Sequence, residues 1–432
     1  MIALSAWLQL HGLALVGNCS LVLLLPTQGL SNVNVGIGAG WILLHRPLVA
    51  GQSRFNVILL PKQLPEPTQL HRSCQGRLQR ERLERVAGGS ASSSIQIILP
   101  DGWQVRSSAE RRGRSEFLVT DVSRAVFVVA KDLRSTQVKV GDFEVEIALN
   151  SSWHFSDTEA SRMVEEILVA YKGIFGTMPS RSAQLAILRP PVERAPDFWE
   201  AETRGNTIII ISSDTAFSDR SQQRLHEQLR HELFHLWLPN GVRLTGEYAW
   251  FYEGFALYSS LKLAVKVRRI RFQDLLETLS RAYAIDSRQN PRTPLIGLSQ
   301  QIAGPPNTQT YARGLLIAFL VDLELMRSSS GSSDSASLMR SIFREFKDRD
   351  KPVDANEALM SIHILRNAAQ RFVFGSEAID LVKELNGTGV EAVQGSGHTK
   401  LSVKSKLNGR EQKILDGLGY NSWRGSPRVQ KR

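Results

Sequence analysis

The hydrophobic residues between positions 90 and 149 fall into short runs separated by glycine, serine and charged residues, a pattern that predicts β-strands. In the run Phe143–Leu149, apolar residues alternate with Glu144 and Glu146. This period of two is typical of a strand with one buried face. The predicted strands cover residues 95–99, 117–120, 125–130 and 143–149. Together they predict a small antiparallel β domain that ends near residue 150.

The pattern changes near residue 155, where apolar residues begin to recur at helical spacing. Ser156 and Glu159 form a predicted capping box, and the helix that follows them runs to about Phe175. Two apolar runs, 184–188 and 207–211, predict further strands. Longer helices are predicted over about 219–237, 247–264, 310–327 and 335–348. A strand-rich segment that precedes a mostly helical one predicts an α+β fold.

The first 45 residues contain no Lys, Arg, Asp or Glu. Within them, an apolar run extends from Leu13 to Leu25 and is followed by Pro26. This run has the length of the apolar part of a secretory signal and is short for a membrane span. Because no basic residue precedes it and no small-residue cleavage site follows it, a wrongly assigned start or a pair of hydrophobic strands is the alternative. We expect export or membrane anchoring, with the chain on the periplasmic or extracellular side and associated with the membrane through this segment.

The chain therefore divides into four predicted segments. Residues 1–45 form the apolar signal or anchor, and residues 46–150 form the N-terminal β domain with a basic linker. Residues 151–370 form the mostly helical domain. From Val373 onward, glycine, serine and lysine replace the helical pattern, so residues 371–432 are predicted to be a basic C-terminal tail, either weakly folded or a small appendage.

The 432 residues carry 53 Lys and Arg against 42 Asp and Glu, which is a formal net charge of +11. Such a charge raises the question of a nucleic-acid or anionic-membrane partner. The basic residues gather in three stretches, 72–85, 106–114 and 400–432, and none of these has the signature of a nucleic-acid-binding module. We expect a solvated basic surface and no nucleic-acid partner. With only two cysteines, the chain is neither a disulfide scaffold nor a CxxC zinc protein.

The most informative sequence is His231-Glu232-Leu233-Phe234-His235, which lies on a predicted helix. Residues four apart share one face of a helix, so both imidazoles can reach a single metal ion. Zinc suits this arrangement because two neutral nitrogens and one carboxylate hold it and leave one position for water. Glu232 is then placed to accept a proton from that water as the water attacks a carbonyl carbon. The sequence predicts one Zn²⁺ ion and a hydrolase.

A third ligand has to come from a neighbouring element. Glu253 lies in the aromatic block Trp250-Phe251-Tyr252-Glu253-Gly254-Phe255, and a helix, a turn and a second helix can fold it back onto the histidine pair. An unpaired glutamate in apolar surroundings is costly, so a metal partner explains Glu253 better than a surface position does. His226 lies five residues before His231 and should not share the metal, because it points to another side of the helix.

These two blocks together resemble the gluzincin metallopeptidases, in particular the glycyl aminopeptidase family and the larger family of alanyl aminopeptidase and leukotriene A4 hydrolase. His-Glu-Leu-Phe-His-Leu-Trp is similar to the HExFHxW block of the glycyl aminopeptidases, and Tyr311-Ala312-Arg313-Gly314 resembles their Y-x-K-G segment. The resemblance implies a thermolysin-like catalytic domain, zinc bound by His231, His235 and Glu253, and a tyrosine, Tyr311, that stabilises the oxyanion. A phenol near the metal is also what a tetrahedral intermediate requires.

One block of the larger family is missing, namely the GAMEN sequence whose glutamate holds the free amine of a substrate. At the equivalent place stands Arg204-Gly205-Asn206-Thr207-Ile208, followed by the predicted strand 207–211. We expect this strand to align a peptide or protein substrate by strand addition, with Asn206, Thr207 and Ile208 as substrate-binding residues. Glu200 and Glu202 are alternative amine binders. The choice between aminopeptidase and endopeptidase stays open.

A second class of function also fits the motif. A degenerate relative of the peptidases would keep zinc as a structural clip and bind peptides without cutting them. The presence of Glu232 argues against this alternative, since a purely structural zinc site has no need of a general base.

Overall fold

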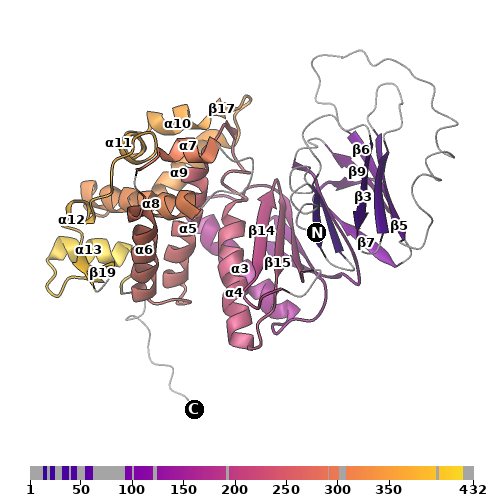
Figure 1. The fold of residues 1–432 in the computed structure, drawn as a ribbon, viewed down its shortest axis with the longest axis horizontal. Coiled ribbons are helices and arrows are strands. Elements are labelled where there is room, and N and C mark those ends of the chain that lie inside the picture. Colours follow the sequence, from indigo (N-terminus) through magenta and orange to yellow (C-terminus); the bar gives the residue numbers. More distant parts are fainter. Residues whose placement is uncertain are drawn as a thin grey trace. The chain divides into compact units, whose positions relative to one another are not determined.

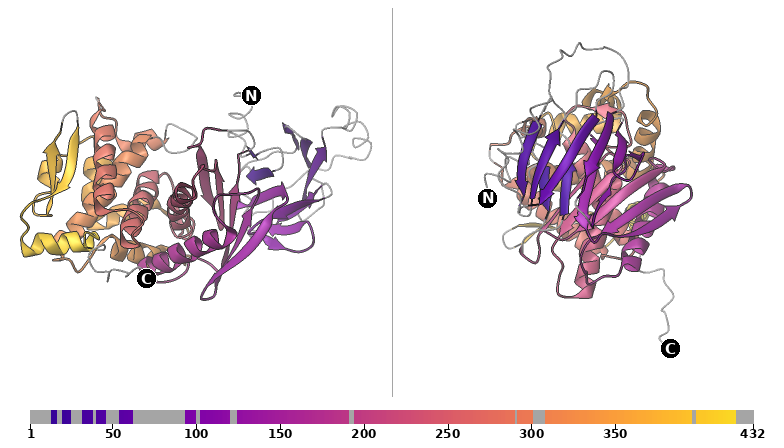
Figure 2. Two further views of the ribbon diagram at one scale, coloured as in Figure 1. Left: turned by 90° about the horizontal axis from the view of Figure 1, so that it is seen from below. Right: turned by 90° about the vertical axis from the view of Figure 1, so that its right-hand side faces the viewer.

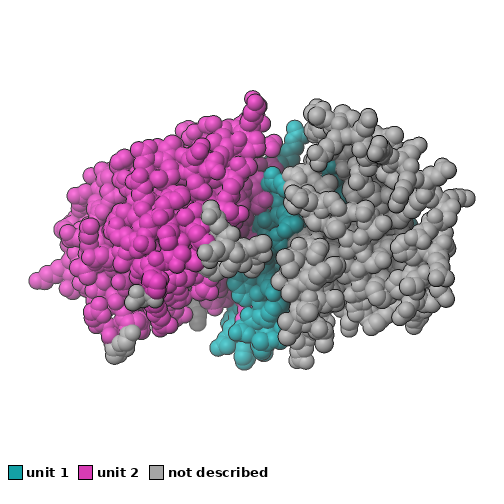
Figure 3. Space-filling view, turned by 45° about the horizontal axis from the view of Figure 1, so that its top comes forward, with its two compact units in different colours: residues 1–161, 181–221 teal, residues 162–180, 222–432 magenta. Residues whose placement is uncertain are grey.

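The computed structural model describes residues 93–99, 102–119, 124–190, 194–289, 291–300, 308–395 and 398–421, together with the backbone of five earlier strands. The predicted basic linker and its arginine-rich stretch 72–85 lie outside these residues. The chain divides into two compact units (Figure 3). Residues 1–161 and 181–221 form unit 1, and residues 162–180 and 222–432 form unit 2. The predicted boundary at residue 150 therefore does not coincide with the division of the chain.

Unit 1 is built from three sheets (Figure 1). A six-stranded sheet has the order β3-β4-β5-β6-β9-β8, and a four-stranded sheet has the order β1-β2-β10-β7. These strands are β1 Leu13–Val16, β2 Ser20–Leu24, β3 Asn32–Ile37, β4 Gly40–His45, β5 Arg54–Pro61, β6 Ser93–Ile98, β7 Trp103–Arg106, β8 Glu110–Arg111, β9 Glu116–Val119 and β10 Val126–Lys131. Three of the predicted strands appear here as β6, β9 and β10.

The third sheet is mixed, with the order β11-β12-β13-β15-β14. Its strands are β11 Arg134–Val140, β12 Phe143–Leu149, β13 Ser182–Leu188, β14 Trp199–Arg204 and β15 Thr207–Ser212. The prediction that Phe143–Leu149 belongs to a purely antiparallel domain is wrong, because β12 pairs in parallel with β13. Helix α3, Asp157–Phe175, makes the crossover that a parallel pair requires. The predicted capping box starts this helix, since the Ser156 amide donates to Glu159 and the Glu159 amide donates to Ser156 Oγ.

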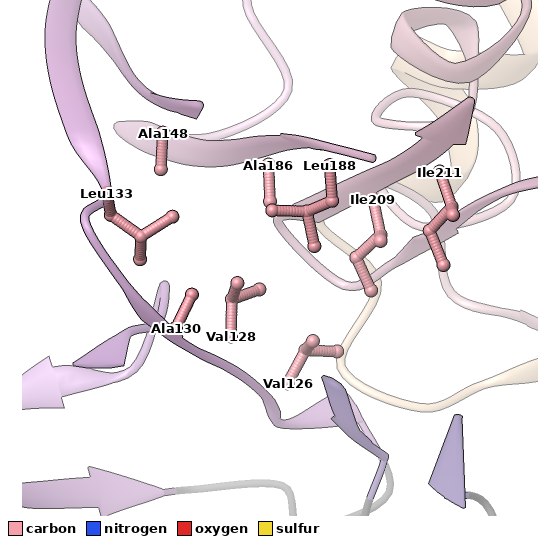
Figure 4. Close-up of a cluster of buried hydrophobic side chains, with 9 residues drawn as sticks. All are labelled: Val126, Val128, Ala130, Leu133, Ala148, Ala186, Leu188, Ile209 and Ile211. Carbon is pink, nitrogen blue, oxygen red and sulfur yellow. The ribbon is translucent and has the colours of Figure 1, made fainter. Parts of the chain in front are cut away.

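One face of the mixed sheet packs on β10 of the four-stranded sheet (Figure 4). Alternate residues of β10 face alternate residues of β12, β13 and β15, as the period of two in a strand requires. The cluster consists of Val126, Val128, Ala130, Leu133, Ala148, Ala186, Leu188, Ile209 and Ile211. The intervening residues of β13 and β15 are buried as well, so both faces of these strands are covered. This explains why the sequences of β13 and β15 are continuous apolar runs without alternation.

Unit 2 is mostly helical. After α4, Ser218–Phe234, the described helices are α5 Ala249–Lys266, α6 Phe272–Ser287, α7 Leu295–Gln300, α8 Thr308–Ser328, α9 Ser335–Phe346, α10 Ala355–Ser361, α11 His363–Phe372, α12 Leu381–Glu384 and α13 Gly409–Gly417. Two short strands, β16 Leu244–Thr245 and β17 Val353–Asp354, pair in parallel. The four long helices predicted after residue 215 correspond to α4, α5, α8 and α9.

The C-terminal segment is folded as far as residue 421, which corrects the prediction of a weakly folded tail. Strands β18, Val390–Gln394, and β19, Thr399–Val403, form a hairpin that lies beside α6, with α13 following it (Figure 2). The Leu401 amide donates a hydrogen bond to Ser280 Oγ on α6. Leu401, Ile414 and Leu415 are each at most 2% exposed. The alternative prediction for this segment, a small folded appendage, agrees with the structure as far as residue 421.

The apolar run near the N-terminus contains the two strands β1 and β2, which pair with each other, and β2 pairs further with β10. This agrees with the alternative of a pair of hydrophobic strands. Among the helices of the described residues, none is both long and apolar enough to cross a membrane. Export or anchoring of the chain stays a prediction.

Candidate metal centre

Helix α4, which carries the HExxH sequence, rests on an aromatic cluster. Trp237 stacks on Phe175 with 5.2 Å between ring centroids, and Phe234 lies edge-on to Phe175 at 5.5 Å. The buried hydroxyl of Tyr171 donates a hydrogen bond to the Arg230 carbonyl in the turn before His231. Aromatic packing of this kind immobilises the end of α4, so the histidines project from a rigid base.

The end of α4 also orients the second histidine. The helix stops at Phe234, three residues earlier than predicted, and tighter turns follow, in which the amide of His235 donates to the Glu232 carbonyl. His235 Nδ1 lies 2.9 Å from the Leu238 carbonyl oxygen. A carbonyl can only accept, so Nδ1 carries a proton, and Nε2 lies on the opposite side of the ring as the nitrogen that could bind a metal.

Glu253 reaches the histidines from the second turn of α5. Its neighbours on this helix, Phe251 and Phe255, are completely buried. Gly254 packs directly on Gly314 of α8, where a Cβ atom added to Gly254 would lie 2.4 Å from the Gly314 carbonyl carbon. Only a residue without a side chain permits this approach of the two helix backbones. The helical turn that carries Glu253 thereby lies in direct backbone contact with α8.

The three predicted ligands meet in one place. His231 Nε2 lies 3.2 Å from His235 Nε2 and 3.1 Å from Glu253 Oε2, and His235 Nε2 lies 3.5 Å from Glu253 Oε2. The side chains of His231 and Glu253 are each 11% exposed, and that of His235 is 7% exposed. Within the described residues, this is the one group of three or more histidine, cysteine or acidic side chains that could hold a metal ion.

These distances fit a tetrahedral zinc ion. Ligand atoms at about 2.0–2.1 Å from zinc, at the tetrahedral angle, lie about 3.3 Å from one another. The three observed separations, 3.1, 3.2 and 3.5 Å, bracket that value. Glu253 Oε2 is also buried, and a metal ion would offset the cost of burying this carboxylate oxygen. The donor set, two imidazole nitrogens and one carboxylate oxygen, is one that catalytic zinc uses.

The electrostatics of the group favour a bound cation. Burial lowers the pKa of His235, but the Glu253 and Glu232 carboxylates outweigh it and raise this pKa to about 9. Burial opposes ionisation of Glu253, yet the two histidines hold the pKa of its carboxyl well below the usual range. The attraction between the Glu253 carboxylate and the histidines contributes to both shifts, and Glu232 adds to the shift of His235.

Glu232 and Tyr311 lie beside the same group. Glu232 is 3% exposed and follows His231 on α4. The ring of Tyr311, in the first turn of α8, lies 6.5 Å from the ring of His231. Burial raises the pKa of the Tyr311 hydroxyl, and the carboxylates of Glu253 and Glu232 raise it further. Tyr311 therefore remains a protonated hydrogen-bond donor at neutral pH.

Strand β15, which was predicted to bind substrate by strand addition, has no free edge. β15 pairs with β13 on one side and with β14 on the other, so neither of its edges can accept an added strand. Thr207 and Ile208 are completely buried, and the carbonyl of Asn206 accepts a hydrogen bond from the Gln184 amide. The prediction of strand addition to 207–211 is therefore wrong. The sequence analysis did not include β14 (199–204) among the strands, although Trp199, Ala201 and Thr203 alternate there with three charged residues, which was the available signal.

Edge strand β14 carries the two glutamates named above as alternative amine binders. Glu200 is exposed, and Glu202 is exposed and forms an ion pair with Arg204 at 2.8 Å. Their roles as amine binders stay predictions.

Two residues of the metal centre were missed in the sequence. The Leu238 carbonyl orients His235, and backbone carbonyls leave no signature in a sequence. Tyr252 lies with its ring 5.9 Å from that of His235, and its place immediately before Glu253 was the available signal. His226 contacts Glu166 and Arg230, away from the histidine pair that could hold the metal, as predicted.

Comparison with solved structures places this geometry on a known fold. An aminopeptidase N family protein from Idiomarina loihiensis superposes with a TM-score of 0.58 at 17% sequence identity, over 70% of this chain and 58% of that protein. The chain shares its fold with this protein. Solved structures with lower TM-scores include an M1 zinc metallopeptidase from Deinococcus radiodurans. Its TM-score is 0.48 at 18% sequence identity, over 67% of this chain and 65% of that protein. A two-domain M1 zinc metallopeptidase with bound L-arginine gives 0.47 at 16% identity, over 84% and 90% of the two chains.

The fold expected from the gluzincin resemblance is thereby confirmed in its coarse form, a mixed α and β structure like that of the Idiomarina protein. The sequence itself matches no family model and no curated protein. The chain spans less than two thirds of the length of the Idiomarina protein.

Proposed function

We propose that this chain is a zinc-dependent peptidase of the gluzincin type. The observation that carries the proposal is the triangle of His231 Nε2, His235 Nε2 and Glu253 Oε2, whose edges of 3.1–3.5 Å fit one tetrahedral zinc ion. These three residues would hold the ion. When bound, zinc supplies a Lewis acid that lowers the pKa of a water molecule and polarises a carbonyl group.

The other residues of the site have distinct roles in this proposal. Glu232 is the general base, because its carboxylate lies next to the ligands and can accept the proton of the attacking water. Tyr311 stays protonated and donates a hydrogen bond to the oxygen of the peptide carbonyl as negative charge develops there. The Leu238 carbonyl keeps the His235 ring in the tautomer that binds metal.

The substrate in this proposal is a peptide or protein. Export of the chain, or anchoring through residues 1–45, is proposed on the apolar sequence of that segment. Whether an amino terminus is recognised is decided by the experiment below.

The proposal is tested by incubating the zinc-loaded chain with a peptide mixture in which each peptide is present with a free and with an acetylated amino terminus. Mass spectrometry identifies the products, and a chelator-treated sample is the control. We expect cleavage that the chelator abolishes. Cleavage restricted to free amino termini assigns an aminopeptidase, and equal cleavage of both forms assigns an endopeptidase. Equal product in the chelated and loaded samples, or no product in either, contradicts the proposal.

Replacement of Tyr311 tests the role of its hydroxyl. In Tyr311→Phe the ring is kept and the donor to the developing oxyanion is lost, so we expect kcat to fall by about 10²–10³-fold. The KM value and the bound zinc should stay within about twofold of the wild type, because Tyr311 is not a ligand. Steady-state kinetics and metal analysis of the two proteins measure this. A kcat equal to that of the wild type would remove Tyr311 from the mechanism.

A further inference from the structure

A buried charged cluster at the junction of α5, α8 and α9 takes no part in the proposed chemistry. Asp322 of α8 is completely buried. Its Oδ2 accepts hydrogen bonds from the hydroxyl of Tyr258, at 2.5 Å, and from Nζ of Lys262, at 2.8 Å, and both donors belong to α5. Its Oδ1 accepts the Ser335 amide at the start of α9, at 2.6 Å. One carboxylate thus connects three helices.

The same cluster contains a second carboxylate. Asp334 Oδ2 lies 3.4 Å from Nζ of Lys262, and Asp334 caps α9, because its Oδ1 accepts the Ser337 amide at 3.0 Å. Two carboxylates therefore share one lysine, and the positive end of the α9 dipole, which faces Asp322, offsets the remaining negative charge. Burial alone would lower the pKa of Lys262, but Asp322 and Asp334 raise it, so the lysine is charged.

Helices α5 and α8 also meet at the glycine pair described above. Gly254 immediately follows Glu253, and Gly314 lies one turn after Tyr311. A Cβ atom added to Gly314 would lie 2.7 Å from the Trp250 carbonyl oxygen, so the two backbones are in direct contact. The glycines permit a close approach, but two smooth backbones in contact do not by themselves prevent one helix from sliding or turning along the other.

The charged cluster supplies what the glycine contact lacks. Lys262 lies eight residues after Gly254, and Asp322 lies eight residues after Gly314. The two contacts are thus separated by the same number of residues on each helix, counted in the same chain direction. Helices α5 and α8 therefore run parallel and in a single register. A slide of one residue, about 1.5 Å, would break the bonds from Tyr258 and Lys262 to Asp322. It would also move Tyr311 relative to Glu253 by the same amount.

We infer that Asp322 is a positioning residue, which holds Tyr311 at a fixed distance from the Glu253 ligand by locking the register of α5 and α8. This inference rests on the proposed function for its catalytic consequence. Asp322 lies about 17 Å from Tyr311 along α8, at 1.5 Å per residue, so it acts only through the position of the helix. A misplacement of about 1 Å at a reacting centre can cost on the order of a hundredfold in rate.

The chemistry of the cluster agrees with a role in fixing the register of α5 against α8. Replacing a buried ion pair by apolar residues of similar volume is often neutral or stabilising, so stability alone does not require charge at this position. Leucine or methionine would fill the same space but would tolerate a slide, because dispersion contacts have no preferred direction. A carboxylate with three donors at 2.5–2.8 Å accepts only one arrangement of the helices around it.

The test compares Asp322→Ala with the wild type in crystal structures and in steady-state kinetics, both with zinc loaded. We expect Tyr311 to shift by 1 Å or more relative to Glu253, while His231, His235 and Glu253 keep their mutual distances and one zinc is bound per chain. The kcat value should fall by about ten- to a hundredfold with KM changed less than threefold. An unshifted Tyr311 overturns the inference, and so does an unchanged kcat in an active protein.

The two proposals are separated by this design. If the wild type does not cleave peptides, the proposed function fails, and the position of Tyr311 in the two crystal structures still decides the inference. If Asp322→Ala does not fold, Tyr258→Phe is used in its place, because it removes one hydrogen bond to Asp322 and keeps the buried ring. A shift of Tyr311 relative to Glu253 is then expected, and an unshifted Tyr311 overturns the inference.

A double mutant distinguishes positioning from general loss of stability. In the Tyr311→Phe background, the change Asp322→Ala should lower kcat by less than threefold, because the group that it positions is already absent. The matched control is Leu401→Ala, which removes a buried side chain of β19 away from the α5–α8 contact and should leave kcat within twofold. Independent, multiplicative effects of the Asp322 and Tyr311 changes would overturn the inference.

Discussion

Glu232→Gln is expected to lower the rate of peptide hydrolysis by about 10²–10⁴-fold while the protein still binds one zinc ion. Glutamine has the same size and shape as glutamate, so the buried position on α4, 3% exposed, is filled as before. What is lost is the basic oxygen that accepts the proton of the attacking water. Steady-state kinetics of the wild type and the variant, after loading with zinc, measure the change.

The zinc content of Glu232→Gln is the internal control, because Glu232 is not among the three converging donors. Full zinc with lost hydrolysis assigns Glu232 to the chemical step. A variant that keeps its zinc and hydrolyses peptides as fast as the wild type would exclude Glu232 as the general base. Loss of zinc together with activity would instead make Glu232 part of the metal site.

His235→Ala is expected to abolish both zinc binding and hydrolysis. The imidazole provides one of three donors, and its Nδ1 bond to the Leu238 carbonyl turns Nε2 toward His231 and Glu253. Loss of one of three protein ligands should weaken zinc binding by at least about a hundredfold, since even residues that only orient a ligand contribute ten- to a hundredfold. Isothermal titration with zinc measures the affinity.

The matched control is His226→Gln, a change of another buried histidine, which lies on α4, the helix that ends immediately before His235. His226 is 1% exposed and contacts Glu166 at 3.3 Å, so its replacement costs stability without removing a donor from the metal centre. We expect zinc affinity within about threefold of the wild type. Equal loss of affinity in both variants would mean that the effect of His235→Ala reports on the fold and not on a ligand.

The grouping of His231, His235 and Glu253 was predictable because its chemistry is encoded locally. Two histidines four apart on an amphipathic helix must share a face, and a glutamate within an aromatic block has few other partners. Both arguments need only the helix period and the cost of burying charge, and the distances around Glu253 agree with them. The role of Tyr311 came from the resemblance, since a single tyrosine at a helix start has no distinguishing spacing.

The pairing of the strands was not predictable to the same degree. Alternation in Phe143–Leu149 indicates a half-buried strand but says nothing about the direction of its partner, and the partner β13 lies beyond helix α3. The position of β15 inside the sheet depends on β14, a short edge strand in which charged residues alternate with Trp199, Ala201 and Thr203 and no residue is fully buried. In both cases the decisive contact is made by residues distant in sequence, which a local pattern cannot encode.

The C-terminal segment shows a similar limit. Its glycines suggested weak structure, yet Gly387 and Gly389 have positive φ angles of 74° and 83° and belong to the turn that leads into β18. Glycine there permits a backbone that other residues rarely adopt. Phe374, Val382 and Val393 are exposed, but other apolar residues of the segment, among them Leu401 and Ile414, are buried, and these are sufficient to fold it.

The central claim is that His231, His235 and Glu253 bind one zinc ion together, and X-ray absorption spectroscopy of the zinc-loaded chain tests it most directly. We predict one zinc per chain, bound by two imidazole nitrogens and by oxygen at about 2.0–2.1 Å, with no sulfur ligand. In Glu253→Ala the affinity for zinc should fall while both imidazole signals remain in any residual complex. A chain that binds no zinc, or a spectrum without imidazole scattering, would contradict the account.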